Sequence, residues 1–241
     1  MIVSGELAKV QQYIDGVLSG DIVVGELVRA SVKRHLDDLE RAENDPAFPY
    51  HFDFNSAEAA CLYFPTCLRH SIGEFASMPF ELEPWQAFGV AMVFGWKRDV
   101  DNSRRFRRVY WSTGRKNGKS TFAGGLALLL ASMDVSPQTG KPESVAEVIL
   151  CATKREQVEM IMFAEIQRMR NQSPAISGAS KVVNKRLEFA HNKGSIRCIG
   201  SDKPYSGLNP SAVLKDELHE FREKVHRKFL ETMDTGGGSR I

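Results

Sequence analysis

The stretch that decides the fold is WSTGRKNGKST, residues 111–121. Two glycines stand in it before a Lys-Ser pair, and an apolar run that suits a buried helix follows. The segment RRVYWST (107–113) is rich in β-branched and aromatic residues and predicts a strand leading into the loop. A strand, a glycine-rich turn and a helix in this order can cradle phosphate groups, because backbone N–H groups of the turn and of the helix N-terminus point at the anion.

The loop departs from the usual phosphate-loop pattern G-x-x-x-x-G-K-[ST] at its first glycine. Thr113 stands where that glycine belongs, and Gly114 lies one place later. The chemistry is still present, because Lys119 can reach the β- and γ-phosphates of ATP and the Ser120 hydroxyl can ligate Mg²⁺. A polar strand-to-helix turn with a fortuitous Gly-Lys-Ser is the alternative. The nucleotide contacts expected from the loop are Gly114, Arg115, Lys116, Asn117, Gly118, Lys119, Ser120 and Thr121.

A second acidic element is expected at SAVLKDELHEF, residues 211–221, where a short apolar strand ends in two carboxylates. Asp216 would hold the hydrated Mg²⁺, and Glu217 would orient and deprotonate the attacking water. Lys215 interrupts the apolar run, which predicts a strand near the sheet edge or a lysine that points outward. The alternative is an N-capping Asp and a first-turn Glu that open a helix over 218–233. Taken with the glycine loop, the pair favours nucleotide hydrolysis.

Two further groups of residues can be read in two ways each. Gln86, in the Pro-Trp-Gln that begins a predicted helix, has an amide that can both donate to and accept from an adenine edge; otherwise it is a surface glutamine. The run RRFRR (104–108) can contact DNA phosphates, but a solvated, partly salt-bridged strand end is the favoured reading. His219 and His226 do not form a metal-ligand pattern.

The periodicity along the chain predicts an α/β fold with a helical preface over 1–75 and a main domain over 76–241. Helices are expected at 6–19, 21–43 and 56–70 in the preface, with a loop at 44–53. Alternating strands and helices in the main domain predict a mostly parallel sheet covered by helices on both faces. The expected strands are 107–113, 145–153, 181–183, 186–190, 194–199 and 212–216, and the helices 119–133, 154–170 and 218–233.

Composition is that of an ordinary soluble protein. The 241 residues carry a net charge of +2 and 26% charged side chains, although 97–119 holds a local surplus of Lys and Arg. No apolar run is long enough to span a bilayer, and the N-terminus has no signal-peptide pattern. The four cysteines lack C-x-x-C spacing, which favours buried, reduced thiols and a cytoplasmic setting.

Three segments together resemble the large terminase subunit of tailed bacteriophages, the ATP-driven motor that packages double-stranded DNA into procapsids. They are PFELEPWQAFGVAMVFGWKR (79–98), RRFRRVYWSTGRKNGKST (104–121) and GLNPSAVLKDELHEF (207–221). The resemblance runs from about residue 22 to the end. It implies a P-loop NTPase fold of the ASCE/RecA-like type, in which Gln86 reads adenine. It also implies that Lys119 and Ser120 are the Walker A residues and Asp216 and Glu217 the Walker B acid and catalytic glutamate.

The resemblance also implies a role for Arg115. Terminase phosphate loops commonly carry an arginine three residues before the second glycine, as a finger in cis or a nucleotide sensor. A guanidinium there can reach the charge that develops on the γ-phosphate during transfer. Lys116 would support phosphate or face solvent. A finger supplied in trans would come from Lys203 or Arg222 of a neighbouring subunit.

The implied partners are double-stranded DNA, the portal protein and the small terminase subunit, in the host cell cytoplasm, with no membrane and no structural place in the virion. The chain would form a ring on the portal and be a monomer in isolation. The stretch ETMDTGGGSR (231–240) resembles the one preceding the family's coupling motif. We therefore expect a truncated ATPase domain without coupling motif or nuclease domain, and weak turnover.

Two other functions stay open at the level of sequence. The D-E-L-H run resembles the D-E-A-H of helicases, and a Gln precedes the loop, but 241 residues leave no room for a second RecA-like domain. The third possibility is a fragment that binds a nucleotide or a partner without hydrolysis.

Overall fold

The computed structural model describes residues 5–114, 116–136, 139–141, 143–201, 208 and 210–236. It divides the chain into two units, each treated by itself. Unit 1 is Met1–Thr66 with Glu81–Val109, and unit 2 is Cys67–Phe80 with Tyr110–Ile241. The segment that carries Gln86 thus groups with the N-terminal helices, whereas the glycine loop belongs to unit 2. The domain boundary near residue 75 stays a prediction.

Unit 1 consists mainly of four helices, which correspond to the three predicted in the preface and the one predicted to begin at Pro-Trp-Gln. They are α1 (Glu6–Ser19), α2 (Glu26–Asn44), α3 (Phe54–Cys67) and α4 (Pro84–Gly95). The third helix begins and ends earlier than the predicted 56–70. The expected loop at 44–53 contains the short strand β1 (Tyr50–Phe52), which pairs antiparallel with β2 (Trp96–Arg98).

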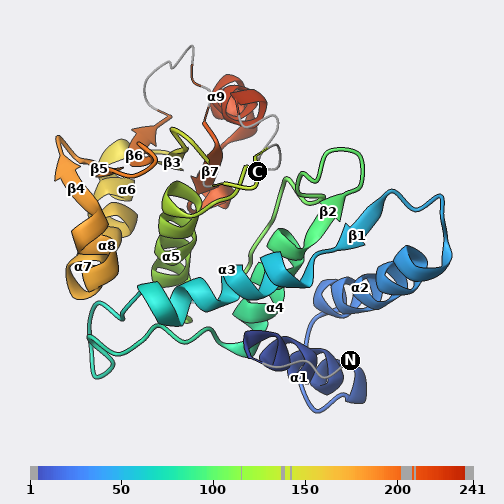
Figure 1. Ribbon diagram of the computed structural model, residues 1–241. Helices are drawn as coiled ribbons and strands as arrows, with labels where there is room; N and C mark the ends of the chain where they lie inside the picture. The colour runs from blue at the N-terminus through green and yellow to red at the C-terminus, as the bar shows by residue number, and fades with distance from the viewer. Residues whose placement is uncertain are drawn as a thin grey trace. The chain divides into compact units, whose positions relative to one another are not determined.

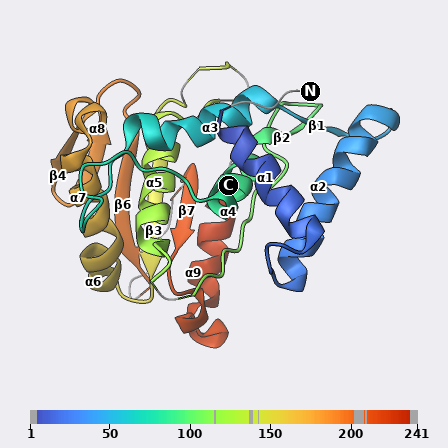
Figure 2. The ribbon, with the colours of Figure 1, turned by 90° about the horizontal axis from the view of Figure 1, so that it is seen from below.

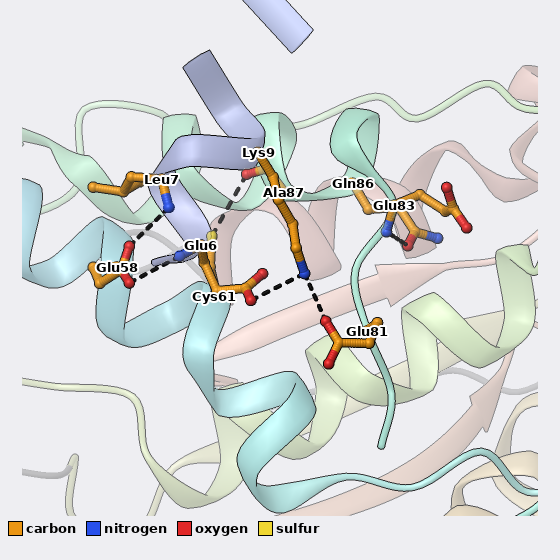
Figure 3. A network of polar contacts seen from close by, with 9 residues as sticks. All are labelled: Glu6, Leu7, Lys9, Glu58, Cys61, Glu81, Glu83, Gln86 and Ala87. Carbon is orange, nitrogen blue, oxygen red and sulfur yellow. Dashed lines mark hydrogen bonds and ion pairs between the residues drawn. The ribbon is translucent and has the colours of Figure 1, made fainter. Parts of the chain in front are cut away.

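Helix α1 packs on α4 through a buried apolar face with helical spacing, formed by Val10, Ile14 and Val17. The N-terminus of α1 has no side-chain cap of its own. Instead, the Glu58 carboxylate of α3 accepts hydrogen bonds from the first two backbone N–H groups of α1, at 3.0 and 2.9 Å (Figure 3). An acceptor from another helix therefore replaces the local cap.

An aromatic cluster holds the arginine run of unit 1. Arg105 Nη1 lies 2.7 Å from Oδ2 of buried Asp38 in an ion pair. The guanidinium of Arg105 packs on the rings of Tyr50 and Trp96. Arg104 packs on Phe94, also inside unit 1. Two of the four arginines in 104–108 are thus used in packing inside unit 1, which differs both from a DNA contact and from the solvated strand end that the sequence favoured.

Unit 2 is built on a five-stranded sheet in the order β4-β5-β6-β3-β7 (Figure 1). Its strands are β3 (Glu147–Ala152), β4 (Ser180–Val183), β5 (Arg186–Phe189), β6 (Ser195–Gly200) and β7 (Ala212–Lys215). Strand β3 pairs parallel with β6 and β7, whereas β4, β5 and β6 pair antiparallel. The α/β fold is confirmed, with a sheet that is mixed and parallel in its β6-β3-β7 part.

Helices cover both faces of this sheet. They are α5 (Lys119–Ser132), α6 (Arg155–Val158), α7 (Ala164–Gln172), α8 (Pro174–Ala179) and α9 (Glu223–Gly236). Phe229 and Met233 of α9 pack on Ile149 and Cys151 of β3, while α5 lies against β3, β6 and β7. Figures 1 and 2 show α5 and α9 on opposite sides of the sheet.

Several predicted elements differ from the structure. Residues 107–113 form no strand, and the side chains of Val109 and Tyr110 are exposed. Strand β7 therefore ends the sheet order among the described strands, which agrees with the edge position predicted from Lys215. The helix predicted over 154–170 contains a π turn, η1 (Glu159–Phe163), between α6 and α7.

The predicted burial of the cysteines is confirmed for three of the four. Cys61, Cys151 and Cys198 are buried thiols and Cys67 is half-buried. Burial raises the pKa of Cys61 and of Cys198 to about 12. Among the described residues, no helix has the length and apolar character needed to cross a bilayer.

Candidate nucleotide site

The start of helix α5 forms the base of the glycine loop. Gly118 precedes the helix with φ of +66°, a left-handed conformation that glycine adopts without steric cost, so the chain turns sharply into α5. The apolar run after Ser120 is buried against the sheet. On the other side of the loop, Trp111 packs edge-to-face on Phe122, with ring centroids 4.8 Å apart. Both ends of the loop therefore contact helix α5, one through Gly118 and the other through Trp111.

Lys119 lies next to the two carboxylates that follow β7. Its Nζ donates a hydrogen bond to Glu217 Oε1 and lies 3.1 Å from Asp216 Oδ1. Burial alone would lower the pKa of Lys119, but hydrogen bonds and charges of Glu217 and Asp216 outweigh it and raise this pKa above its ordinary value. The structure therefore brings together the two elements that the sequence analysis paired.

The carboxyl end of β7 fixes the two acidic residues. The backbone N–H of Asp216 donates to Cys151 O of β3 at 2.9 Å, which extends the parallel ladder by one residue. The carboxylate of Asp216 accepts from the backbone N–H of Glu217 at 3.0 Å. The reading of Asp216 as a helix N-cap is wrong, because a short 3₁₀ turn, η2 (Leu218–Glu220), follows and α9 begins only at residue 223.

Glu217 adopts a conformation that non-glycine residues rarely take. Its φ is 48° and its ψ is 51°, in the left-handed region. Such residues cost on the order of 1–3 kcal/mol and cluster at functional sites. The conformation turns the chain immediately after the strand and places the Glu217 carboxylate, one-third exposed, against Lys119. A second contact is His219 Nδ1, 3.4 Å from Glu217 Oε2.

The other loop residues differ in solvent exposure and in hydrogen bonding. Asn117 and Lys116 are exposed, Lys116 with φ of +68°, and Ser120 is half-buried. The Thr121 hydroxyl donates to Glu165 of α7 at 3.0 Å, and the nucleotide contact expected of Thr121 stays a prediction. The Thr113 hydroxyl is buried and makes no hydrogen bond within the described part of the chain.

Three residues singled out from the sequence are not tested by this geometry. Arg115 and Lys203 lie outside the described residues. Arg222 is exposed, and its carbonyl accepts from the His226 backbone N–H at 2.9 Å. Their roles stay predictions.

Gln86 is buried in unit 1, with 4% of its surface exposed, rather than lying on the surface. Its side-chain carbonyl accepts a hydrogen bond from the Glu83 backbone N–H at 2.9 Å, as half of a capping box that opens α4 (Figure 3). This contact fixes the amide and leaves the second lone pair of its oxygen. Its adenine contact stays a prediction.

The donor set suits a magnesium ion that also binds phosphate. Ser120 and Asp216 offer hard oxygen ligands, which Mg²⁺ prefers, and Mg²⁺ usually takes only one or two protein ligands besides water and phosphate. Among the described residues, no group of three or more His, Cys, Asp or Glu side chains could hold a metal by itself. The residues present therefore fit a substrate-bound Mg²⁺ rather than a closed protein metal centre.

Comparisons with known proteins agree with this geometry. The family model described as terminase large subunit, ATPase domain, matches residues 84–236, which include Gln86, the loop and both carboxylates. Among solved structures, the large terminase of bacteriophage HK97 matches with a TM-score of 0.59 and 21% identity. The match covers 76% of this chain and 35% of that chain, and it shows a shared fold. No curated protein sequence matches significantly.

Proposed function

Because the chain belongs to the family of terminase large subunit ATPase domains, we propose that its glycine loop binds Mg²⁺·ATP and that hydrolysis drives the packaging of double-stranded DNA into procapsids. The observation that carries this proposal is the contact of Lys119 with Asp216 and Glu217. A cation at a helix N-terminus and two carboxylates at the end of a neighbouring strand are the groups that phosphoryl transfer requires.

Each residue of the loop and of the acidic pair has its own task in this proposal. Backbone N–H groups at the start of α5 hold the phosphates, and Lys119 moves its ammonium from the carboxylates to the β- and γ-phosphates. Ser120 and Asp216 hold Mg²⁺, which supplies charge neutralisation on the phosphates. The transfer of Lys119 releases Glu217, which then orients a water and accepts its proton.

Arg115 and Gln86 complete the proposed site on the strength of the family resemblance. Arg115 would stabilise the charge on the γ-phosphate in cis, and Gln86 would read the adenine edge. Lys203 or Arg222 of a neighbouring subunit would act in trans. The partners proposed are DNA, held through its backbone rather than its sequence, the portal and the small terminase subunit, in a ring in the host cytoplasm.

Phosphate release by the purified chain, with and without double-stranded DNA, tests this function. Lys119→Ala should abolish ATP binding, whereas Lys181→Ala, an exposed lysine of β4 at the other end of the sheet order from β7, serves as the control. Unchanged ATP affinity in Lys119→Ala would overturn the assignment of the loop. ATP binding without phosphate release would support a binding fragment, and unwinding of a tailed duplex would support a helicase instead of a motor.

A further inference from the structure

A buried carboxylate in unit 2 has no part in the proposed mechanism. Glu165 of α7 is 3% exposed. Its Oε1 accepts hydrogen bonds from Ser71 Oγ at 2.6 Å and from Thr121 Oγ1 at 3.0 Å. Its Oε2 accepts from Arg168 Nη2 at 2.8 Å and Nε at 3.2 Å. Both oxygens are therefore engaged, as a buried charge requires.

Glu165 is ionised in this environment. Burial would raise the pKa of the carboxyl, but the hydrogen bonds from Ser71, Arg168 and Thr121 and the charge of Arg168 lower it below its usual range. An ionised carboxylate accepts strong hydrogen bonds from hydroxyl groups. The Thr121 hydroxyl is thus bound to α7 by a contact stronger than one between neutral groups.

The backbone before Glu165 sets its direction. The π turn η1 ends at Phe163, and α7 begins at the next residue, Ala164. The backbone N–H of Ala164 donates to the carbonyl of Glu159, five residues earlier in the chain. One extra residue in a helix rotates the residues after it by about 100° relative to an uninterrupted α-helix. Glu165 lies immediately after this shift, and its side chain meets α5. A continuous amphipathic helix would direct it elsewhere.

Helix α5 also approaches α7 closely at its second turn. A Cβ added to Gly124 would lie 3.2 Å from Ile166 Cγ1, so a larger residue there would require α7 to give way. The first two turns of α5 thus meet neighbouring residues of α7, Thr121 on Glu165 and Gly124 on Ile166. The helix N-terminus is fixed in position along and around its axis by two different contacts.

We propose that Glu165 is a positioning residue of the nucleotide site, which acts through Thr121. The inference rests on the proposed function, because it takes the start of α5 as the phosphate-binding element. Thr121 follows Ser120 directly, so a fixed Thr121 also fixes the Ser120 hydroxyl and the adjacent backbone N–H groups. Thr121 is then an anchor of the loop rather than a nucleotide ligand. Preorganised donors bind phosphate without first losing conformational freedom.

A double-mutant cycle on nucleotide binding tests the proposal. The dissociation constant of Mg²⁺·ADP is measured by titration calorimetry for the wild type, Thr121→Val, Glu165→Ala and the double variant. Each single variant should bind about fivefold more weakly, the equivalent of one hydrogen bond, and the double variant no more weakly than the weaker single one. Glu165→Gln, which keeps an acceptor oxygen, and Thr121→Ser, which keeps the hydroxyl, should recover most of the affinity.

Gln172→Ala is the matched control, because Gln172 lies on the same helix and accepts from Ser77 without touching Thr121. Additive losses would mean that Thr121 binds phosphate itself and would overturn the proposal. Unchanged affinity in Glu165→Ala and Glu165→Gln, with only a lower melting temperature, would reduce Glu165 to a structural residue and overturn it too. Failure of the wild type to bind Mg²⁺·ADP would refute the proposed function. The wild type is measured first, so this failure is distinguished from a failure of the proposal on Glu165.

Discussion

Replacing Glu217 by Gln should strengthen ATP binding and slow ATP hydrolysis. In the structure Glu217 pairs with Lys119, the cation that must reach the phosphates. The two side chains are 33% and 39% exposed, so solvent weakens their attraction, and the pair is worth up to about 1 kcal/mol. Glutamine removes this competition, and Mg²⁺·ATP should bind up to about fivefold more tightly. Asp216 remains and limits the gain.

Turnover of the same variant should fall by at least about 100-fold, because the amide cannot accept the proton of the attacking water. Binding is measured by titration calorimetry and turnover by phosphate release, both at low and at high salt. The affinity gain should shrink at high salt, where the ion pair of the wild type is screened. Normal turnover would remove Glu217 as the base, and weaker ATP binding would contradict the competition for Lys119.

Three other outcomes are expected. Arg115→Ala should slow phosphate release with nearly unchanged ATP affinity; equal losses in both would assign Arg115 to ground-state binding. Lys116→Gly should raise the free energy of unfolding by about 0.5–1 kcal/mol. Glycine adopts the left-handed conformation without the steric cost that lysine has, and the greater entropy of the unfolded chain offsets part of this gain. Weaker ATP binding by this variant would assign Lys116 to phosphate binding.

The third is that the stability of unit 1 should depend on the protonation of His35. Burial lowers the pKa of His35 from 6.5 to about 4, so the unfolded chain binds the proton first as the pH falls. The free energy of unfolding should therefore fall by up to about 3 kcal/mol between pH 6.5 and pH 4. His35→Asn, whose side-chain oxygen can still accept the hydrogen bond from Trp96 Nε1, should lose this part of the pH dependence. Unfolding curves followed by Trp fluorescence at several pH values measure it. The same pH dependence in the wild type and in the variant would contradict the role given to His35.

The sequence predicted the chemical elements of the site because each is a local pattern. The Gly-Lys-Ser turn and the Asp-Glu pair after an apolar strand require particular residue types in a row, and parallel pairing of β3 and β7 then places Asp216 near Lys119. The segment 107–113 shows the limit of propensity. Its residues suit a strand, but a strand also needs a partner edge, which a single segment does not reveal.

The roles of Glu165 and Arg105 could not be predicted from the sequence. Glu165 stands between Ala164 and Ile166 in a predicted helix, and nothing in this local sequence identifies Thr121 as its partner. The π turn before Glu165 directs its side chain to Thr121. Arg105 belongs to a run of arginines that suggests a surface, yet it pairs with Asp38, distant in sequence. Buried charges depend on partners that the fold supplies, and no local pattern marks them.

The most direct test of the central claim is a crystal structure of the chain with Mg²⁺ and a non-hydrolysable ATP analogue. We expect the phosphates to lie at the N-terminus of α5, with Lys119 on the γ-phosphate and away from Glu217, and with Mg²⁺ on Ser120 and near Asp216. A nucleotide bound elsewhere, or phosphates at the loop with Lys119 still paired to Glu217, would contradict the account.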